Sequence, residues 1–221
     1  MQRFIMDLDG TLMPSHEVDN RCYWQAVEEV FEIETGLPEL RNFRHITDFG
    51  ILQEWANLQL GRIPTGDEIR SVRQVFLTRL ERNAQQNPAH FEPLPGVRQW
   101  LSGQSEHGQR QLAIATGGWR HTAEFKLRTS GLAQFDIPLA SADDAVRRTD
   151  IMRCALHMLV APDDIAPTPT YIGDGPWDYQ ASRDLGWEFL GIASGTRARH
   201  LREAGASHVY PDFEALAADQ R

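Results

Sequence analysis

Two short acidic segments of the sequence place carboxylates beside glycines. Asp7 and Asp9 stand in the segment DLDGTL, and Asp174 and Asp178 stand in YIGDGPWD. Two acids at positions i and i+2 can point the same way where a strand ends and the backbone turns. Gly10 permits such a turn and exposes N–H groups that could bind an anion. An acidic turn is the alternative for each segment taken alone, because Asp and Gly are common turn formers.

Two further segments could bind a phosphoryl group. In IATGG, the hydroxyl of Thr116 and the N–H groups that follow it can hold phosphoryl oxygens at a helix N-terminus. A simple helix N-cap is the alternative role for this threonine. The segment RRTD opens with Arg147 and Arg148 at the expected start of a helix, where an exposed basic pair is the alternative.

The elements that must position these segments are alternating strands and helices. Each segment follows a predicted strand, and such alternation is typical of a parallel sheet covered by helices on both faces. The carboxyl ends of parallel strands lie at one edge of a sheet, so the four segments could converge on one site. We expect an α/β fold with strands at 2–8, 111–116, 137–140, 170–173, 188–193 and 208–210, and helices near 119–130, 150–160, 177–185 and 196–204.

Residues 15–92 show helical periodicity and almost no strand pattern. Thr65 and Glu68 form a capping-box sequence that predicts the start of one of these helices. The segment EPLPG that follows residue 91 is a stiff, turn-rich joint. We therefore expect an α/β core domain formed by residues 1–14 and 93–221, and an inserted helical domain formed by residues 15–92.

Composition excludes several classes of partner and of chemistry. The chain has 221 residues, with 22 basic against 31 acidic residues, and a net charge of −9. No basic cluster interrupts this acidity, so nucleic acid and anionic membranes are not expected as main partners. Lys126 is the only lysine, which leaves almost no candidate for Schiff-base chemistry.

The sequence gives no sign of export, of a membrane anchor or of disulfides. Asp7 comes too early for the apolar region of a signal peptide. No stretch approaches the roughly 18 apolar residues of a membrane helix. Cys22 and Cys154 lie far apart and do not suggest a disulfide framework. We expect a reduced, soluble cytoplasmic protein that is a monomer or a weak homodimer.

The order of the four segments resembles the haloacid dehalogenase-like (HAD) hydrolase superfamily. DLDGTL, IATGG, a basic residue opening a helix, and GDGPWD occur here in the order of that superfamily's motifs. The helical insert lies where its helical-cap members, such as phosphoglycolate phosphatases and phosphomutases, carry their cap. The resemblance implies a Rossmann-like core sheet with a helical cap, and a phosphatase that depends on Mg²⁺.

The resemblance also implies a role for each matching residue. Asp7 would attack phosphorus and form an aspartyl phosphate, and Asp9 would protonate the leaving oxygen and later accept a proton from water. Mg²⁺ would be held by Asp7, the backbone carbonyl of Asp9, and Asp174. Asp178 would be a further acid at the metal or would orient its neighbours. The phosphoryl oxygens would be bound by residues of the first three segments, namely Gly10, Thr11, Thr116, Gly117 and Arg148.

The third segment departs from the usual family pattern, which has a lysine. No lysine lies near this position, so an arginine must serve. We favour Arg148 over Arg147, because it stands two residues before Asp150, in the register that the family's lysine keeps. An arginine can bind two phosphoryl oxygens at once and stays charged at any working pH.

Single residues distinguish other activities of the superfamily from the phosphatase expected here. Haloalkanoate dehalogenases lack the second acid of the first segment, so Asp9 argues for phosphoryl chemistry. Phosphonate-cleaving relatives need a cap lysine, and residues 15–92 contain none. A sugar phosphomutase uses the same two aspartates and stays an alternative. A catalytically silent relative that binds a phosphorylated ligand is another, although the presence of all four aspartates counts against it.

The substrate is expected to be a small phosphorylated metabolite, such as a sugar phosphate or a phosphoglycolate-like acid. The cap closes over the core in such relatives and contacts the leaving group. The aromatic candidates could instead pack in the core of the cap. His45 and Asp48 could form a metal pair, and the alternative for them is a capping role or a surface position. The candidate cap residues are Tyr23, Trp24, His45, Asp48 and Phe49.

Overall fold

A six-stranded parallel sheet forms the centre of the fold. The computed structural model describes residues 2–106, 110–160 and 168–220, with no side-chain description for 105, 106 and 110. The strands follow the order β3-β2-β1-β4-β5-β6, and every neighbouring pair is parallel. Their bounds are β1 (Gln2–Met6), β2 (Arg110–Ala115), β3 (Leu139–Ala140), β4 (Thr170–Gly173), β5 (Glu188–Ile192) and β6 (Val209–Tyr210).

Alternating side chains on the central strands divide the core into two halves. Ile5 pairs in register with Ala113 and Tyr171, and all three belong to one buried cluster. The next residue, Met6, pairs with Ile114 and Ile172, which belong to the other cluster. Because both faces are covered, β1 and β2 are apolar over their carboxyl-terminal halves, as buried parallel strands require, whereas their first two residues are polar.

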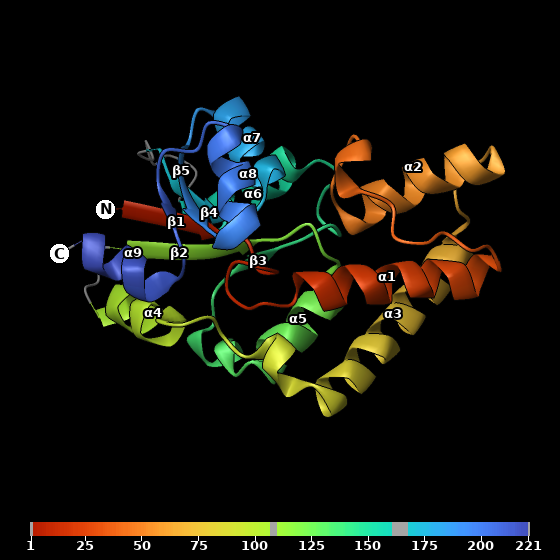
Figure 1. The fold of residues 1–221 in the computed structure, drawn as a ribbon, viewed down its shortest axis with the longest axis horizontal. Helices are drawn as coiled ribbons and strands as arrows, with labels where there is room; N and C mark the ends of the chain where they lie inside the picture. The colour runs from red at the N-terminus through yellow and green to blue at the C-terminus, as the bar shows by residue number, and fades with distance from the viewer. Residues whose placement is uncertain (1, 107–109, 161–167, 221) are drawn as a thin grey trace.

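Helices cover both faces of this sheet (Figure 1). One face carries α6 (Arg148–His157), α7 (Pro176–Leu185) and α8 (Gly195–Glu203), and the other carries α4 (Val97–Glu106), α5 (Arg120–Thr129) and α9 (Phe213–Asp219). The predicted α/β fold is confirmed. Among the α-helices of the described residues, α4 and α9 lie where no helix was predicted. Short 3₁₀ turns η1 (Leu40–Asn42), η2 (Pro88–Phe91) and η3 (Leu132–Phe135) join longer elements.

The segment between β1 and α4 is helical, as predicted. It contains α1 (His16–Phe31), α2 (Asp48–Leu60) and α3 (Gly66–Gln86), beyond the carboxyl ends of the strands (Figure 1). The predicted capping box opens α3, since Thr65 accepts from the Glu68 N–H and the Glu68 carboxylate accepts from the Thr65 N–H. The division of the chain into core and cap domains at residues 14/15 and 92/93 stays a proposal.

Aromatic side chains join this helical insert to the rest of the chain. Tyr23 of α1 contacts Phe76 of α3 edge-on, with ring centroids 5.6 Å apart. Trp119, which precedes α5, lies 5.9 Å from the Tyr23 ring and 6.3 Å from the Phe76 ring. The insert and the sheet layer therefore share one continuous apolar cluster, which holds the insert over the strand ends.

The structure also describes both cysteines and the lengths of the helices. Cys22 and Cys154 are both free, in agreement with the expected absence of a disulfide. Within the described ranges, none of the helices has the length and apolar character needed to cross a membrane.

Candidate functional site

Three carboxylates converge at the carboxyl end of the sheet. Asp7 follows β1, Asp174 follows β4, and Asp178 lies in the first turn of α7. Since β1 and β4 are neighbours, one oxygen of each carboxylate lies within 4.8 Å of the others. All three side chains are buried. Carboxylate oxygens are the ligands that Mg²⁺ and similar hard cations prefer.

Arg148 and Asp178 orient the first of these carboxylates. The guanidinium of Arg148 lies 3.4 Å from Asp7 Oδ1 and 2.7 Å from Asp178 Oδ1. The other oxygen of Asp178 accepts N–H donations from Asp174 and Gly175 at 3.2 and 2.9 Å. Asp178 thus holds both the loop after β4 and the arginine that faces Asp7.

Asp174 has one oxygen that fits a metal ion. Its Oδ2 accepts from Arg197 at 2.8 Å, whereas its buried Oδ1 has no hydrogen-bond partner among the described residues. Burial raises the pKa of Asp174 to about 7, and burial also raises the pKa of Asp7 well above its usual range. A divalent cation would favour the ionised forms and would satisfy the free oxygen. The donor set therefore fits Mg²⁺.

The structure distinguishes the two arginines of the third segment. Arg148 is the first residue of α6, and its side chain is directed toward Asp7 and Asp178. Arg147 precedes the helix and is exposed. Of the two, Arg148 has the geometry expected for the residue that contacts a phosphoryl group.

Asp9 is held by a lysine that no sequence motif indicated. Lys126 Nζ donates to both carboxylate oxygens of Asp9, at 2.7 and 2.6 Å, and also pairs with Asp19. Burial alone would lower the pKa of Lys126, but the charges of Asp19 and Asp9 raise it. The side chain of Asp9 is outside the group of three carboxylates, and its contact with a metal through the backbone carbonyl stays a prediction.

Thr116 and Gly117 face the carboxylates from β2. Thr116 is buried directly after the strand, and its hydroxyl accepts from the Gly118 N–H at 3.1 Å. Trp119, and not Thr116, occupies the N-cap position of α5, so the alternative N-cap role is wrong. A Cβ atom on Gly117 would lie 2.7 Å from Arg148 Nη2 and 2.8 Å from the Ile46 carbonyl. Only glycine allows this close approach.

Gly10 and Thr11 do not have the free N–H groups that the sequence suggested. The Gly10 N–H donates to the Met13 carbonyl at 2.7 Å, and the Thr11 N–H donates to the Leu8 carbonyl at 3.3 Å. The turn itself uses these N–H groups, and the expected phosphate contacts of Gly10 and Thr11 stay a prediction. Gly10 instead allows close packing: its φ is +85°, and a Cβ atom there would collide with the Asp174 carboxylate.

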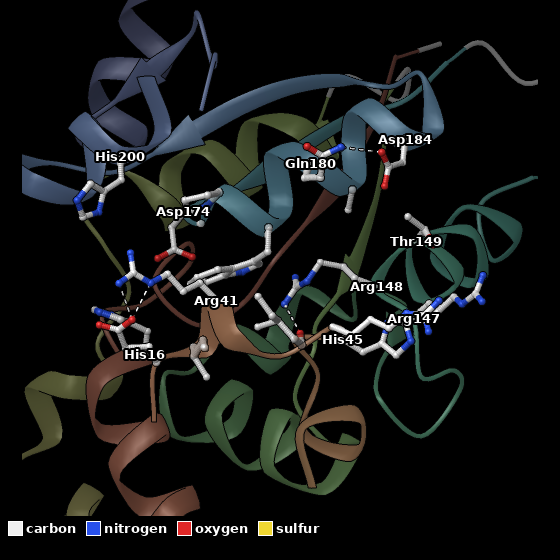
Figure 2. A pocket seen from close by; sticks show the side chains of 18 of the residues that line it. His16, Arg41, His45, Arg147, Arg148, Thr149, Asp174, Gln180, Asp184 and His200 are labelled. Carbon is white, nitrogen blue, oxygen red and sulfur yellow. Dashed lines mark hydrogen bonds and ion pairs between the residues drawn. The ribbon is translucent and has the colours of Figure 1, made fainter. Parts of the chain in front are cut away.

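Two adjoining cavities meet at Arg148. The smaller, of about 90 Å³, is lined by the reactive candidates Asp7, Asp9, Thr116 and Gly117. The larger, of about 950 Å³, lies between residues 39–46, the start of α6 and α7 (Figure 2). Five residues line both cavities: His16, Leu40, Ile46, Arg148 and Trp177. A phosphoryl group in the smaller cavity would leave the rest of a ligand in the larger one.

The candidate residues of the insert divide between these cavities and the core. Tyr23 lines the smaller cavity and donates to the Asp48 carbonyl at 2.8 Å, whereas Trp24 is fully buried in the apolar cluster. His45 lines the larger cavity. Phe49 is half-buried and packs against the core cluster.

His45 and Asp48 line different cavities. The Asp48 carboxylate accepts from the Trp119 N–H at 2.8 Å, and the Asp48 N–H donates to the Gly117 carbonyl at 2.8 Å. Asp48 therefore joins the insert to the loop after β2. In the described part of the chain, Asp7, Asp174 and Asp178 are the one group of three or more His, Cys, Asp or Glu side chains placed closely enough to hold a metal ion.

Comparisons with known proteins agree with this geometry. The family model described as haloacid dehalogenase-like hydrolase matches residues 4–192. A search of curated protein sequences finds no match. Among solved structures, a hydrolase from Pseudomonas syringae is similar over 100% of this chain and 98% of its own, with 24% identity and a TM-score of 0.75.

Two other solved structures share the fold at lower identity. CbbY from Rhodobacter sphaeroides, solved in complex with phosphate, has 18% identity and a TM-score of 0.71, and the match covers 98% of this chain and 96% of that one. A predicted phosphoglycolate phosphatase from Haemophilus somnus 129pt has 16% identity and a TM-score of 0.67, with 100% and 98% covered.

Metal binding at Asp174 should depend on pH. Its raised pKa, about 7, means that the folded chain binds a proton there more tightly than the unfolded chain does. That contribution to stability is complete below the unfolded pKa near 4 and is lost as pH rises through 7. Mg²⁺ must compete with this proton, so thermal denaturation should show a larger Mg²⁺-induced rise in Tm at about pH 8 than at about pH 5.5. In Asp174→Asn the rise should be small at both pH values; an unchanged rise there would argue against the site.

The close approach at Gly117 should make that position intolerant of a side chain. Gly117→Ala should lower the free energy of unfolding by about 1–3 kcal/mol, because Arg148 or the Ile46 backbone must move. Gly118→Ala is the matched control, since a Cβ atom there has no neighbour closer than 3.5 Å. Urea denaturation of both variants measures the difference, and equal losses would contradict the steric explanation.

Proposed function

Because the chain belongs to the haloacid dehalogenase-like hydrolase family, we propose that it is a Mg²⁺-dependent phosphatase that acts on a small phosphorylated metabolite. The observation that carries the proposal is the placement of Asp7, Asp9 and Arg148 around one small cavity. This arrangement offers a nucleophile, an acid and a cation to a single phosphoryl group.

In the first step a carboxylate oxygen of Asp7 attacks phosphorus. The new bond makes an aspartyl phosphate, and the bond from phosphorus to the leaving oxygen breaks. Asp9, protonated at this point, gives its proton to the leaving oxygen, so that an alcohol departs. In the second step a water molecule loses a proton to Asp9 while its oxygen attacks phosphorus. Inorganic phosphate leaves and the Asp7 carboxylate is restored.

The residues around Asp7 supply positive charge and hydrogen bonds. Arg148 can bind phosphoryl oxygens from its position 3.4 Å from Asp7. Thr116 lines the same cavity and offers its hydroxyl. Asp7 and Asp174 would hold Mg²⁺, with Asp178 as a further acid beside them. When bound, this ion reduces the repulsion between the anionic nucleophile and the anionic substrate.

A phosphomutase is the second candidate, because it uses the same two aspartates. It must exclude water from the aspartyl phosphate until the phosphoryl group returns to substrate. Hydrogen bonds between the insert and the core favour such closure: the Thr47 hydroxyl donates to the Val146 carbonyl at 2.8 Å, and the Asp48 N–H donates to the Gly117 carbonyl. Release of inorganic phosphate from substrate supports the phosphatase, and isomerisation without release supports the mutase.

The larger cavity favours a substrate with a second anionic group. In a chain of net charge −9, this cavity is lined by five arginines and three histidines against three acids. Arg41 is paired with Glu39, but Arg44 and Arg147 form no ion pair within the described residues. Burial and these two positive charges lower the pKa of His45, which lies near Arg147 in Figure 2. A carboxylate or second phosphate on the substrate would meet this charge.

Asp7→Asn should abolish turnover while the fold survives, because an amide cannot attack phosphorus. With p-nitrophenyl phosphate and Mg²⁺, the natural chain should release p-nitrophenol and the variant should not. Acid quench after mixing with ³²P-labelled substrate should trap a phosphoenzyme only in the natural chain. Residual turnover with a trapped phosphoenzyme in Asp7→Asn would move the nucleophile to another residue.

A panel of phosphate monoesters should show the preference for a second anionic group. We expect kcat/KM to be at least about tenfold higher for esters that carry a carboxylate or second phosphate than for uncharged esters of similar size. Arg147→Gln should lower this preference about tenfold, through KM, and leave uncharged esters unaffected. Arg153→Gln is the matched control, because Arg153 lies on α6, which Arg147 directly precedes, pairs with Asp150 and does not line the cavity. Equal effects of the two variants would refute the assignment.

A further inference from the structure

The only lysine of the chain is buried beside the reactive cavity. Lys126 lies on α5, and its side chain is fully buried. Its ammonium lies between two carboxylates from different parts of the chain, Asp9 from the loop after β1 and Asp19 from the first turn of α1. Each of these side chains is 15% exposed, so the lysine is the innermost member of the group.

Stability gives a weak reason for a lysine at this position. Burying an ammonium has an effective penalty of several kcal/mol, and well-packed apolar residues often replace buried ion pairs at no loss. The adjacent residue Leu127 and the preceding buried residue Ala123 pack within the apolar cluster. An apolar residue at 126 would continue that pattern, so the charge at this place calls for another explanation.

The contacts of Lys126 fix the orientation of the Asp9 carboxyl. Lys126 Nζ lies 2.7 Å from Asp9 Oδ1 and 2.6 Å from Asp9 Oδ2. The Ser15 hydroxyl donates to Oδ1 at 2.6 Å. Without the lysine, Asp9 would keep one of these donors and could rotate about its side-chain bonds. Proton transfer in catalysis depends on such orientation.

Asp19 fixes the lysine in turn. It pairs with Lys126 from α1, the helix that follows the Asp9 loop directly. The neighbouring buried carboxylate of Asp48 is engaged elsewhere, since it accepts from the Trp119 N–H. Two carboxylates therefore position the lysine: Asp9, which is a reactive candidate at the cavity, and Asp19, which serves as an anchor.

We propose that Lys126 is a positioning residue for proton transfer, which holds Asp9 at the leaving oxygen of the substrate and is itself anchored by Asp19. The proposal rests on the function proposed above. Asp9 gives the proton as the bond from phosphorus to the leaving oxygen breaks, and takes a proton back from the attacking water. Lys126 exchanges no proton with substrate and acts through Asp9 alone.

The test compares esters with good and poor leaving groups. Lys126→Met keeps the length of the side chain and removes the ammonium. For alkyl phosphates, which need a proton on the leaving oxygen, kcat/KM should fall about 100-fold. For p-nitrophenyl phosphate, which does not need this proton, kcat/KM should change less than about threefold. For that ester kcat and KM should fall together, because the later attack of water still needs a positioned Asp9.

Three further variants make the result decisive. Asp19→Asn leaves the lysine in place and should give the same leaving-group dependence in weaker form, which tests the proposal even if Lys126→Met does not fold. Leu127→Ala is the matched control for loss of packing on the same helix, and it should show no leaving-group dependence. Asp9→Asn should show the strongest dependence.

The outcomes separate this proposal from the proposed function. Equal losses for both kinds of ester in Lys126→Met and Asp19→Asn, or no loss for alkyl phosphates, would overturn the role of Lys126. If Asp9→Asn shows strong leaving-group dependence in the same series, the phosphatase mechanism stands even when the role of Lys126 is overturned. If Asp9→Asn shows no such dependence, the acid–base role of Asp9 fails, and the role of Lys126 fails with it.

Discussion

Concentrated negative charge at one end of the sheet is the constraint that the rest of the site must satisfy. Three buried carboxylates lie within 4.8 Å of one another, and one of them, Asp7, lines the smaller cavity together with Asp9 and Asp19. Carboxylates removed from water are costly to ionise unless cations or hydrogen-bond donors face them. The fold brings one cation from each of three helices: Lys126 from α5, Arg148 from α6 and Arg197 from α8.

Each of these cations pairs with different carboxylates, so the carboxylates can have different roles. Arg148 lies between Asp7 and Asp178, so it can face a phosphoryl group without leaving its partner. Arg197 pairs with one oxygen of Asp174 and leaves the other free. Lys126 is confined to Asp9 and Asp19. A nucleophile, a metal ligand and an acid can thus lie close together with different surroundings, which is how neighbouring carboxyl groups come to perform different chemistry.

Much of the fold and part of the site could be predicted from local sequence. Apolar strands followed by glycine and aspartate predict the sheet, and its parallel order brings Asp7 and Asp174 together. The choice between Arg147 and Arg148 depends on where α6 begins, which sequence indicates only to within a residue. The structure places Arg148 at that start and directs it inward.

Other features depend on tertiary packing, which no local pattern reveals. Lys126 meets Asp9 across 117 residues of sequence, from the buried side of an ordinary helix. The Gly10 and Thr11 N–H groups are paired within the turn, a detail that depends on the exact path of four residues. The helices α4 and α9 are short, and neither begins with the Thr-x-x-Glu sequence that marks α3, although Asp212 caps α9 by accepting from the Ala215 N–H at 2.9 Å.

The shared border of the two cavities has an evolutionary consequence. Arg148 and the other four shared residues lie between the smaller cavity, proposed above to hold the phosphoryl group, and the larger one, proposed to hold the rest of the substrate. In the loop of residues 39–46, the larger cavity alone is lined by Glu39, Arg41, Arg44 and His45. Thr47 and Asp48 join the end of the loop to the core. Under the proposed function, mutations in this loop would change substrate selectivity and leave Asp7, Asp9 and Arg148 unchanged.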